Sequence, residues 1–99
     1  MGVPPIPRVA FLSQNAPNPF VQTTSVRYGL PVSGRAELGV YTVQGRLVRR
    51  LVSGLVEAGE HVATWDGRDD AGRRVAAGVY YYALVTPQGR FDKKMLALP

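Results

Sequence analysis

Glycine and proline cut this chain into short segments, and that feature constrains its fold most. The 99 residues include 11 Gly and 8 Pro, and both residue types disfavour the interior of a helix. Between these breaks, apolar and polar residues alternate as they do in strands with one buried face. The strands that this pattern predicts are residues 8–12, 23–30, 35–43, 46–52, 60–66, 79–86 and 90–98. Their number and spacing predict an all-β fold, an immunoglobulin-like sandwich of about seven antiparallel strands.

The length suits a single domain. We assign residues 8–99 to the sandwich and residues 1–7 to a proline-rich linker or arm, because Pro4, Pro5 and Pro7 favour an extended conformation. The longest apolar run, residues 79–85, is far shorter than the roughly 20 residues that cross a membrane. We therefore expect no transmembrane segment.

Two segments allow more than one interpretation. Residues 46–52 could form a helical turn, but Gly45 and Gly54 bound them and the segment is too short for a stable helix, which favours a strand. Gln44 and Gly45 predict a two-residue hairpin loop before that strand. Residues 55–59 are expected to be a loop, and residues 66–78 a long polar turn.

The aromatic residues predict where the core lies. Trp65 is expected to pack between the two sheets, with His61 at the rim of a sheet. Tyr80 and Tyr82 should share one face of their strand, whereas Tyr81 should point the other way. A tyrosine on the wetter face could contact a partner.

The chain offers little for catalysis. It has no Cys and one His, which excludes thiol nucleophiles, disulfides and His-rich or thiolate metal sites. It also lacks a phosphate-binding glycine loop and a nucleophile elbow. We therefore expect no enzyme activity and no cofactor.

Asp66, Asp69 and Asp70 are the best metal candidates. Clustered carboxylates suit calcium, but their spacing does not follow the alternating calcium-loop pattern. Aspartate is also an ordinary turn residue, and three arginines within residues 68–74 can neutralise these carboxylates. A turn held by local ion pairs is the favoured interpretation.

The net charge of +5 could favour anionic partners. The cations are spread along several segments, so ordinary solubility charge is the simpler interpretation and no nucleic acid partner is expected. Two groups of cations could form a basic patch if their strands are neighbours: Arg46, Arg49 and Arg50 in one group, and Arg90, Lys93 and Lys94 in the other. The favoured alternative is that these charged side chains protect sheet edges from aggregation.

Several motifs occur in a characteristic order along the chain. They are Pro-Asn-Pro-Phe at 17–20, Val-Arg-Tyr-Gly-Leu-Pro at 26–31, Trp-Asp-Gly at 65–67 and Gly-Val-Tyr at 78–80. This series resembles the C-terminal sorting domain of proteins exported by the type IX secretion system. It is also similar to the immunoglobulin-like domain of the flagellar hook-capping protein, and the resemblance extends from Leu12 to the end.

The resemblance implies a non-catalytic β-sandwich that serves an exported bacterial protein in secretion sorting or cell-surface attachment. Its partner would be a protein of the secretion or surface machinery, and its location extracellular or at the cell surface. The candidate partner contacts are Pro17, Asn18, Pro19, Phe20, Tyr81, Arg90, Lys93 and Lys94. For residues 17–20 a structural role is the favoured alternative, with Phe20 closing the end of the sandwich.

Two other functions remain open. The chain could be a structural subunit that assembles into a homo-oligomer or an extracellular fibre, by adding its N-terminal arm or strand to the open edge of a neighbour. It could also be a carbohydrate-binding module that uses its tyrosines.

Overall fold

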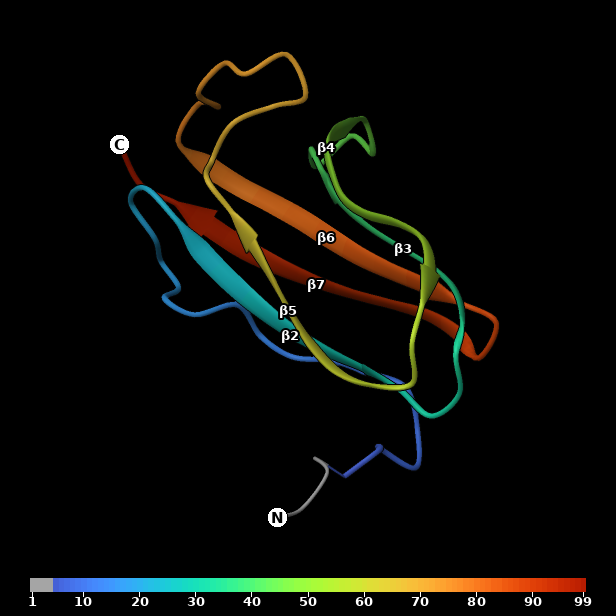
Figure 1. Cartoon of the computed structure of the whole chain (residues 1–99). Coiled ribbons are helices and arrows are strands. Elements are labelled where there is room, and N and C mark those ends of the chain that lie inside the picture. The colour runs from blue at the N-terminus through green and yellow to red at the C-terminus, as the bar shows by residue number, and fades with distance from the viewer. Residues whose placement is uncertain (1–4) are drawn as a thin grey trace.

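The computed structural model describes residues 5–99, which form a sandwich of two antiparallel sheets (Figure 1). Part of the expected arm, residues 1–4, lies outside the described residues. The strands are β1 (Phe11–Leu12), β2 (Thr24–Leu30), β3 (Gly34–Tyr41), β4 (Leu47–Val56), β5 (Gly59–Trp65), β6 (Gly78–Thr86) and β7 (Gly89–Ala97). The predicted all-β, immunoglobulin-like fold is confirmed.

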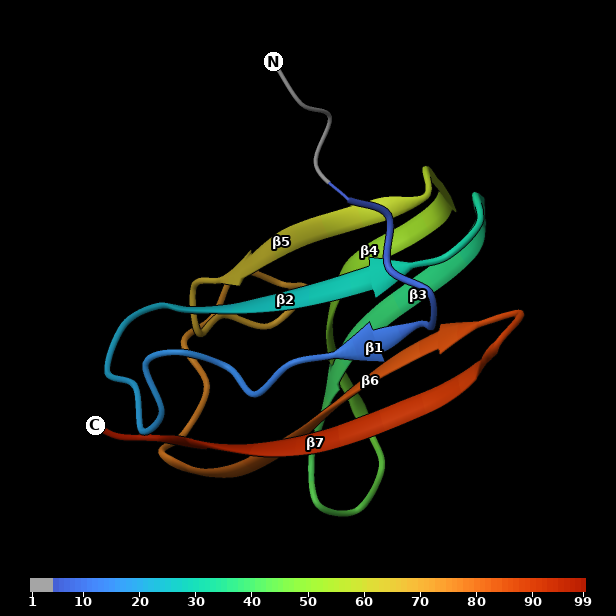
Figure 2. The same cartoon turned by 90° about the horizontal axis from the view of Figure 1, so that it is seen from below.

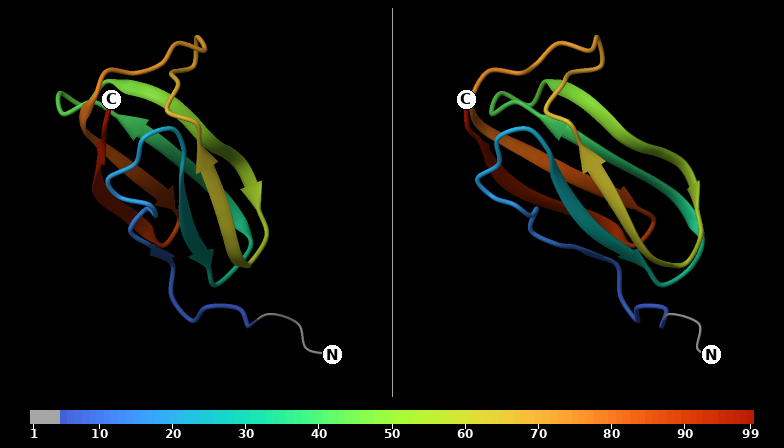
Figure 3. Two further views of the ribbon diagram at one scale, coloured as in Figure 1. Left: turned by 90° about the vertical axis from the view of Figure 1, so that its left-hand side faces the viewer. Right: turned by 60° about the vertical axis from the view of Figure 1, so that its left-hand side comes forward.

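One sheet has three strands in the order β1-β2-β5, and the other has four in the order β4-β3-β6-β7. Figure 2 shows the sheets stacked face to face, with β1 on the side where β7 forms the edge of the larger sheet. Residues 5–7 lie at one end of the sandwich, and the C-terminus lies at the other end (Figure 3). No helix long and apolar enough to cross a membrane occurs among residues 5–99.

The core forms where alternating side chains of both sheets meet. Trp65 from β5 is 1% exposed, and its ring centroid lies 5.7 Å from that of Tyr80 on β6. The predicted alternation of the tyrosines is confirmed, and the structure shows that Tyr80 and Tyr82 face inward whereas Tyr81 faces outward. His61 is partly buried, stacks on Tyr28 and hydrogen-bonds through Nε2 to the Glu57 carbonyl oxygen.

Strand β4 is longer and less regular than its sequence predicts. Its pairing with β3 shifts at two places, so Val48 and Leu51 have no direct partner and form β-bulges. The bulges change which side of the strand faces the core, and this explains why the apolar residues of β4 follow a helix-like spacing. The expected loop at residues 55–59 is partly wrong, because the strand continues to Val56.

The turn between β3 and β4 also differs from the prediction. Thr42 N donates to the Arg46 carbonyl oxygen at 2.9 Å, and Gly45 N donates to the Thr42 carbonyl oxygen at 2.9 Å. The loop therefore holds three residues, not two. Gly45 has φ of 90°, and a glycine with positive φ after a turn of this kind is the usual way to rejoin the ladder.

Strand β1 is shorter than the predicted 8–12 segment, yet it is held firmly against β2. A Cβ atom on Gly29 would lie 2.2 Å from Phe11 Cε1 and 2.9 Å from Pro7 Cγ. Because Gly29 has no side chain, Pro7 and Phe11 can lie directly on β2. Arm or strand exchange between copies stays a prediction.

Candidate functional site

Residues 14–20, here called the proline corner, run along the outer edge of β7. Phe20 N donates to the Leu96 carbonyl oxygen at 3.0 Å, and Leu98 N donates to the Phe20 carbonyl oxygen at 2.8 Å. The Asn18 side chain accepts from Leu96 N at 3.0 Å, and Gln14 Nε2 donates to the Lys94 carbonyl oxygen at 2.8 Å. The corner thus satisfies backbone groups that a bare sheet edge would expose.

A buried polar cluster holds the proline corner from inside. Asn15 is 3% exposed. Its side-chain Nδ2 donates to Thr24 Oγ1 at 3.0 Å and to the Pro17 carbonyl oxygen at 3.2 Å. Thr24 Oγ1 donates to the same Pro17 carbonyl oxygen at 2.9 Å. These hydrogen bonds give the turn a defined shape, fixed by paired groups that are largely shielded from water. The peptide bonds that precede Pro17 and Pro19 are both cis.

Tyr82 joins this cluster to the larger sheet. Its hydroxyl accepts from Asn15 N at 2.8 Å and donates to the Ser13 carbonyl oxygen at 2.8 Å. Burial raises the pKa of Tyr82 to about 12, although the hydrogen bond from Asn15 acts in the opposite direction. The hydroxyl therefore stays protonated and can serve as donor and acceptor at once.

The members of the proline corner divide into buried and accessible residues. Phe20 is 1% exposed and its ring centroid lies 5.5 Å from that of Trp65, so its side chain closes the end of the sandwich. The hypothesis that the Phe20 side chain contacts a partner is wrong for this structure, because core residues cover it. Pro17, Asn18 and Pro19 are exposed.

A hollow of about 180 Å³ lies beside the proline corner. It is lined by Asn18, Val79, Lys94, Met95 and Leu96. Two predicted partner contacts, Asn18 and Lys94, therefore meet at one surface although they lie 76 residues apart in the sequence. Lys93, another predicted partner contact on β7, points to the face opposite to that of Lys94, on the same side of the strand as Met95.

Residues 66–77, here called the acidic loop, cap the other edge of the larger sheet. Asp70 N donates to the Val48 carbonyl oxygen at 3.0 Å, and Asp70 Oδ1 accepts from Arg50 N at 3.2 Å. Arg49 lies 3.3 Å from Asp66 Oδ1 and 3.7 Å from Asp70 Oδ1. The acidic loop therefore binds the backbone of β4 and is tied to it by an arginine.

The calcium hypothesis for Asp66, Asp69 and Asp70 finds no support in this geometry. Asp69 Oδ1 accepts from the backbone N–H groups of Ala71 and Arg73, at 3.0 Å and 2.9 Å. The other two carboxylates face Arg49 and local amides. No group of three metal-ligating side chains gathers anywhere in residues 5–99. These carboxylates instead stabilise a turn, which is the alternative that the sequence favours.

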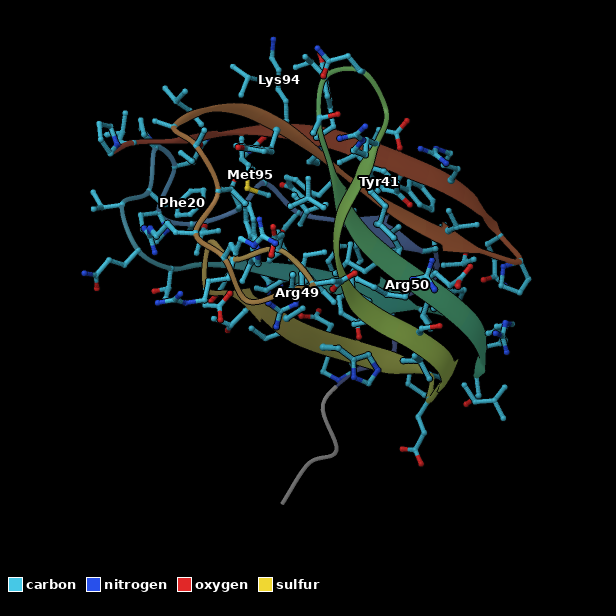
Figure 4. All side chains as sticks on the ribbon, turned by 90° about the horizontal axis from the view of Figure 1, so that it is seen from above. Phe20, Tyr41, Arg49, Arg50, Lys94 and Met95 are labelled. Atoms are coloured by element: carbon cyan, nitrogen blue, oxygen red, sulfur yellow. The ribbon has the colours of Figure 1, made fainter. Side chains whose placement is uncertain are left out.

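The two cationic groups do not form one patch. Arg46, Arg49 and Arg50 lie at or beside β4, whereas Lys94 lies on β7, and these strands are the opposite edges of the four-stranded sheet. Figure 4 shows Lys94 far from Arg49 and Arg50. The condition for a joint basic patch is therefore not met.

The outer face of the larger sheet carries a groove of about 400 Å³. It is lined by Tyr41, Thr42, Val43, Gly45, Tyr81, Ala83, Arg90 and Asp92. We call it the tyrosine groove. Two predicted contacts, Tyr81 and Arg90, lie in it. Sequence reasoning missed Tyr41, Ala83 and Asp92, because only the pairing of β3 with β6 and of β6 with β7 brings them together.

Comparison with known proteins identifies the family. The profile of the FlgD Ig-like domain matches residues 15–89, which include both edge-capping segments almost completely. The chain belongs to the FlgD Ig-like domain family.

Two proteins that this domain resembles are FlgD proteins of other bacteria. The basal-body rod modification protein FlgD of Salmonella typhimurium is 29% identical over 87 residues, which cover 85% of this chain and 38% of that protein. The crystal structure of FlgD from P. aeruginosa is 27% identical, with a TM-score of 0.59, and the match covers 75% of this chain and 58% of that chain. The chain thus spans only part of the length of these proteins.

Another solved structure is similar to this chain in fold alone. PorZ, described as an essential bacterial surface component of the type-IX secretion system of Porphyromonas gingivalis, is 19% identical with a TM-score of 0.60. The match covers 91% of this chain and 11% of PorZ. The FlgD Ig-like fold is therefore also found as a small part of a much larger surface protein.

Proposed function

We propose that this FlgD Ig-like domain is a non-catalytic docking module of an exported bacterial protein. It fastens that protein to a partner protein of the secretion or cell-surface machinery. We further propose that the proline corner is its docking surface and that the domain works outside the cell or at the cell surface.

The observation that carries this proposal is the construction of the proline corner. Its shape is fixed from inside by Asn15, Thr24 and Tyr82, yet Pro17, Asn18 and Pro19 are exposed. A surface that is rigid before binding loses little conformational entropy when it docks, which favours affinity. The charge of Lys94 beside the hollow would favour an acidic group on the partner.

The position of the proline corner also suits a docking role. Residues 5–7 lie at the opposite end of the sandwich (Figures 1 and 3). A polypeptide that entered the sandwich there would leave the corner accessible. The names of the relatives support a role in an assembly rather than in catalysis, since they are a rod modification protein and a surface component of a secretion system.

A secretion assay tests the proposal. A reporter enzyme with a signal peptide is joined in front of the 99-residue chain and produced in a bacterium that has type IX secretion. We expect the reporter to reach the cell surface or the medium, and Lys94→Glu to reduce the exported fraction at least severalfold. Lys94 is exposed, so the charge reversal should leave the fold intact.

Arg35→Glu provides the matched control, since Arg35 is also exposed but belongs to β3 and lies at the end of that strand nearest the β2–β3 turn. It should export the reporter as the unchanged chain does. Burial of Trp65 provides a fluorescence check that each variant is folded. If the folded chain fails to export the reporter, or if both charge reversals act equally, the docking proposal is wrong.

A further inference from the structure

The tyrosine groove is built from three neighbouring strands whose outward residues fall into register. Tyr41 and Tyr81 form one row across β3 and β6, and Lys94, which continues this row on β7, lines the hollow beside the proline corner and not the groove. Gly39, Ala83 and Asp92 form the next row. Side chains in such rows are direct neighbours on one face of a sheet. In the groove, the aromatic side chains therefore lie beside a row in which β3 and β6 contribute two small residues, Gly39 and Ala83.

The small residues explain why the surface is hollow. Ala83 is 3% exposed although it lies on the outer face, so its methyl group forms a floor. A Cβ atom on Gly39 would lie 3.1 Å from the Tyr41 hydroxyl oxygen and 3.2 Å from Tyr41 Cε1. The Tyr41 ring thus extends back along β3 over Gly39. Tyr81, which is 41% exposed, stands beside it with its ring available to solvent.

The side of the groove along β7 is polar. Arg90 Nε donates to Asp92 Oδ1 at 3.0 Å, and both side chains are more than half exposed. The guanidinium retains other N–H donors and the carboxylate retains another acceptor oxygen. Among the described residues, Arg90 and Asp92 are the only charged ones that line the groove, and their charges cancel. The lining therefore combines aromatic surface with paired donors and acceptors and has no net charge.

The location of the groove excludes one common type of protein recognition. Strands β3 and β6 are the inner strands of the sheet, and each has a hydrogen-bonded neighbour on both sides. Their backbone groups are used within the sheet, so an extended peptide could not add itself there as a further strand. A ligand that lies over β3 and β6 must therefore be recognised through ring faces and side-chain polar groups.

We propose that the tyrosine groove binds a neutral carbohydrate. A pyranose ring has an apolar face of C–H groups that can pack on an aromatic ring such as Tyr81, and hydroxyl groups that both donate and accept hydrogen bonds. Arg90 and Asp92 supply the complementary donor and acceptor at the other side of the groove. The volume of about 400 Å³ lies within the usual range for small-ligand sites. This inference goes beyond the proposed docking function, because it uses a different surface from the proline corner.

Titration of the 99-residue chain with neutral oligosaccharides tests this proposal. Cellohexaose, xylohexaose, mannohexaose and chitohexaose are added separately, and binding is followed by NMR shifts and by the tyrosine fluorescence change. We expect at least one of them to bind with a dissociation constant of about 1 mM or better. Tyr81→Ala should weaken that binding about fivefold or more, the usual effect of losing a dominant contact.

Val62→Ala is the matched control, because Val62 is 66% exposed on the other sheet. It should bind as the unchanged chain does. A proline-rich hexapeptide provides the competing probe. If none of the four sugars binds, if only the peptide binds, or if Tyr81→Ala and Val62→Ala bind a sugar equally well, the carbohydrate site is refuted. The secretion assay above depends on Lys94→Glu, so each proposal can fail without the other.

Discussion

The two edges of the four-stranded sheet are capped by segments that do the same task with different chemistry. The proline corner covers β7 with a buried aromatic ring and a buried polar cluster around Asn15. The acidic loop covers β4 with exposed carboxylates and the partly exposed Arg49. Both segments give hydrogen-bond partners to edge backbone groups.

The two caps should contribute unequally to the stability of the domain. Buried hydrogen bonds and buried rings contribute much more to folding than exposed ion pairs do, because water does not compete for the same groups. The proline corner should therefore unfold only with the whole domain, whereas the acidic loop should detach at small cost. A docking surface built on the first segment is rigid, and the second segment can tolerate sequence change.

Phe20→Ala should have the largest effect. It removes a ring that is 1% exposed and packs on Trp65, and we expect the free energy of unfolding to fall by about 3–5 kcal/mol. Urea denaturation followed by Trp65 fluorescence measures this. The neighbouring Val21→Ala, at a side chain that is largely exposed, should change stability by less than about 0.5 kcal/mol. Similar losses in both variants would contradict the role of Phe20.

Asn15→Ala should come next, with a loss of about 2–3 kcal/mol. It removes the two hydrogen bonds that Asn15 Nδ2 donates, to Thr24 Oγ1 and to the Pro17 carbonyl oxygen, and it leaves a cavity where the buried side chain was. Asn18→Ala is the comparison within the same corner, because Asn18 is exposed and bonds Leu96 N. It should cost about 0.5–1 kcal/mol by the same denaturation assay. An equal cost for the two asparagines would mean that burial does not strengthen the corner.

Tyr82→Phe should lower stability by about 1–2 kcal/mol at neutral pH, because it removes the hydroxyl that bonds Asn15 N and the Ser13 carbonyl oxygen. It should also change the response to alkali. The folded pKa of Tyr82 is about 12 against an ordinary value of 10.0, so the unfolded chain loses this proton first. The stabilisation is complete below pH 10 and is lost as the pH rises toward 12.

Denaturation at several pH values between about 9 and 12 measures this contribution as a difference between the two proteins. The unchanged chain should lose stability more steeply over this window, by up to about 1.4 kcal/mol per pH unit. Parallel pH profiles would show that Tyr82 ionises as easily in the folded state as in the unfolded one.

Asp70→Ala should have the smallest effect, about 0.5–1 kcal/mol, because Asp70 is more than half exposed and its contacts compete with water. Added salt should reduce the difference from the unchanged chain, since the ion pair with Arg49 is screened. Thermal unfolding at low and high salt measures both. A loss as large as that of Asn15→Ala would show that the two caps are equivalent.

Much of the sandwich could be predicted from local patterns. The pattern predicted that Trp65 lies in the core and that Tyr80 and Tyr82 share a face opposite to Tyr81. The prolines at 17 and 19 indicated a fixed turn, with Phe20 closing the end of the sandwich. These predictions depend only on neighbours in the sequence and on the period of two along a strand.

The errors arise where neighbouring residues do not decide the structure. In β4, two bulges shift the alternation, so the spacing of Val48, Leu51 and Val52 resembles that of a helix. The tyrosine groove depends on which strands become neighbours and in which register, since Tyr41 and Tyr81 are 40 residues apart. Such long-range pairing has no local signature, and the capping of β4 by Asp70 was hidden for the same reason.

Native-state hydrogen exchange tests the central claim, that the proline corner is a rigid part of the fold while the acidic loop is held loosely. The two amides to compare are Phe20 N–H, bonded to the Leu96 carbonyl oxygen, and Arg50 N–H, bonded to Asp70. We predict that Phe20 exchanges only through near-global unfolding, that Arg50 exchanges through an easier local opening, and that Asn15→Ala removes the difference. Equal protection of both amides in the unchanged chain, or faster exchange at Phe20, would contradict the account.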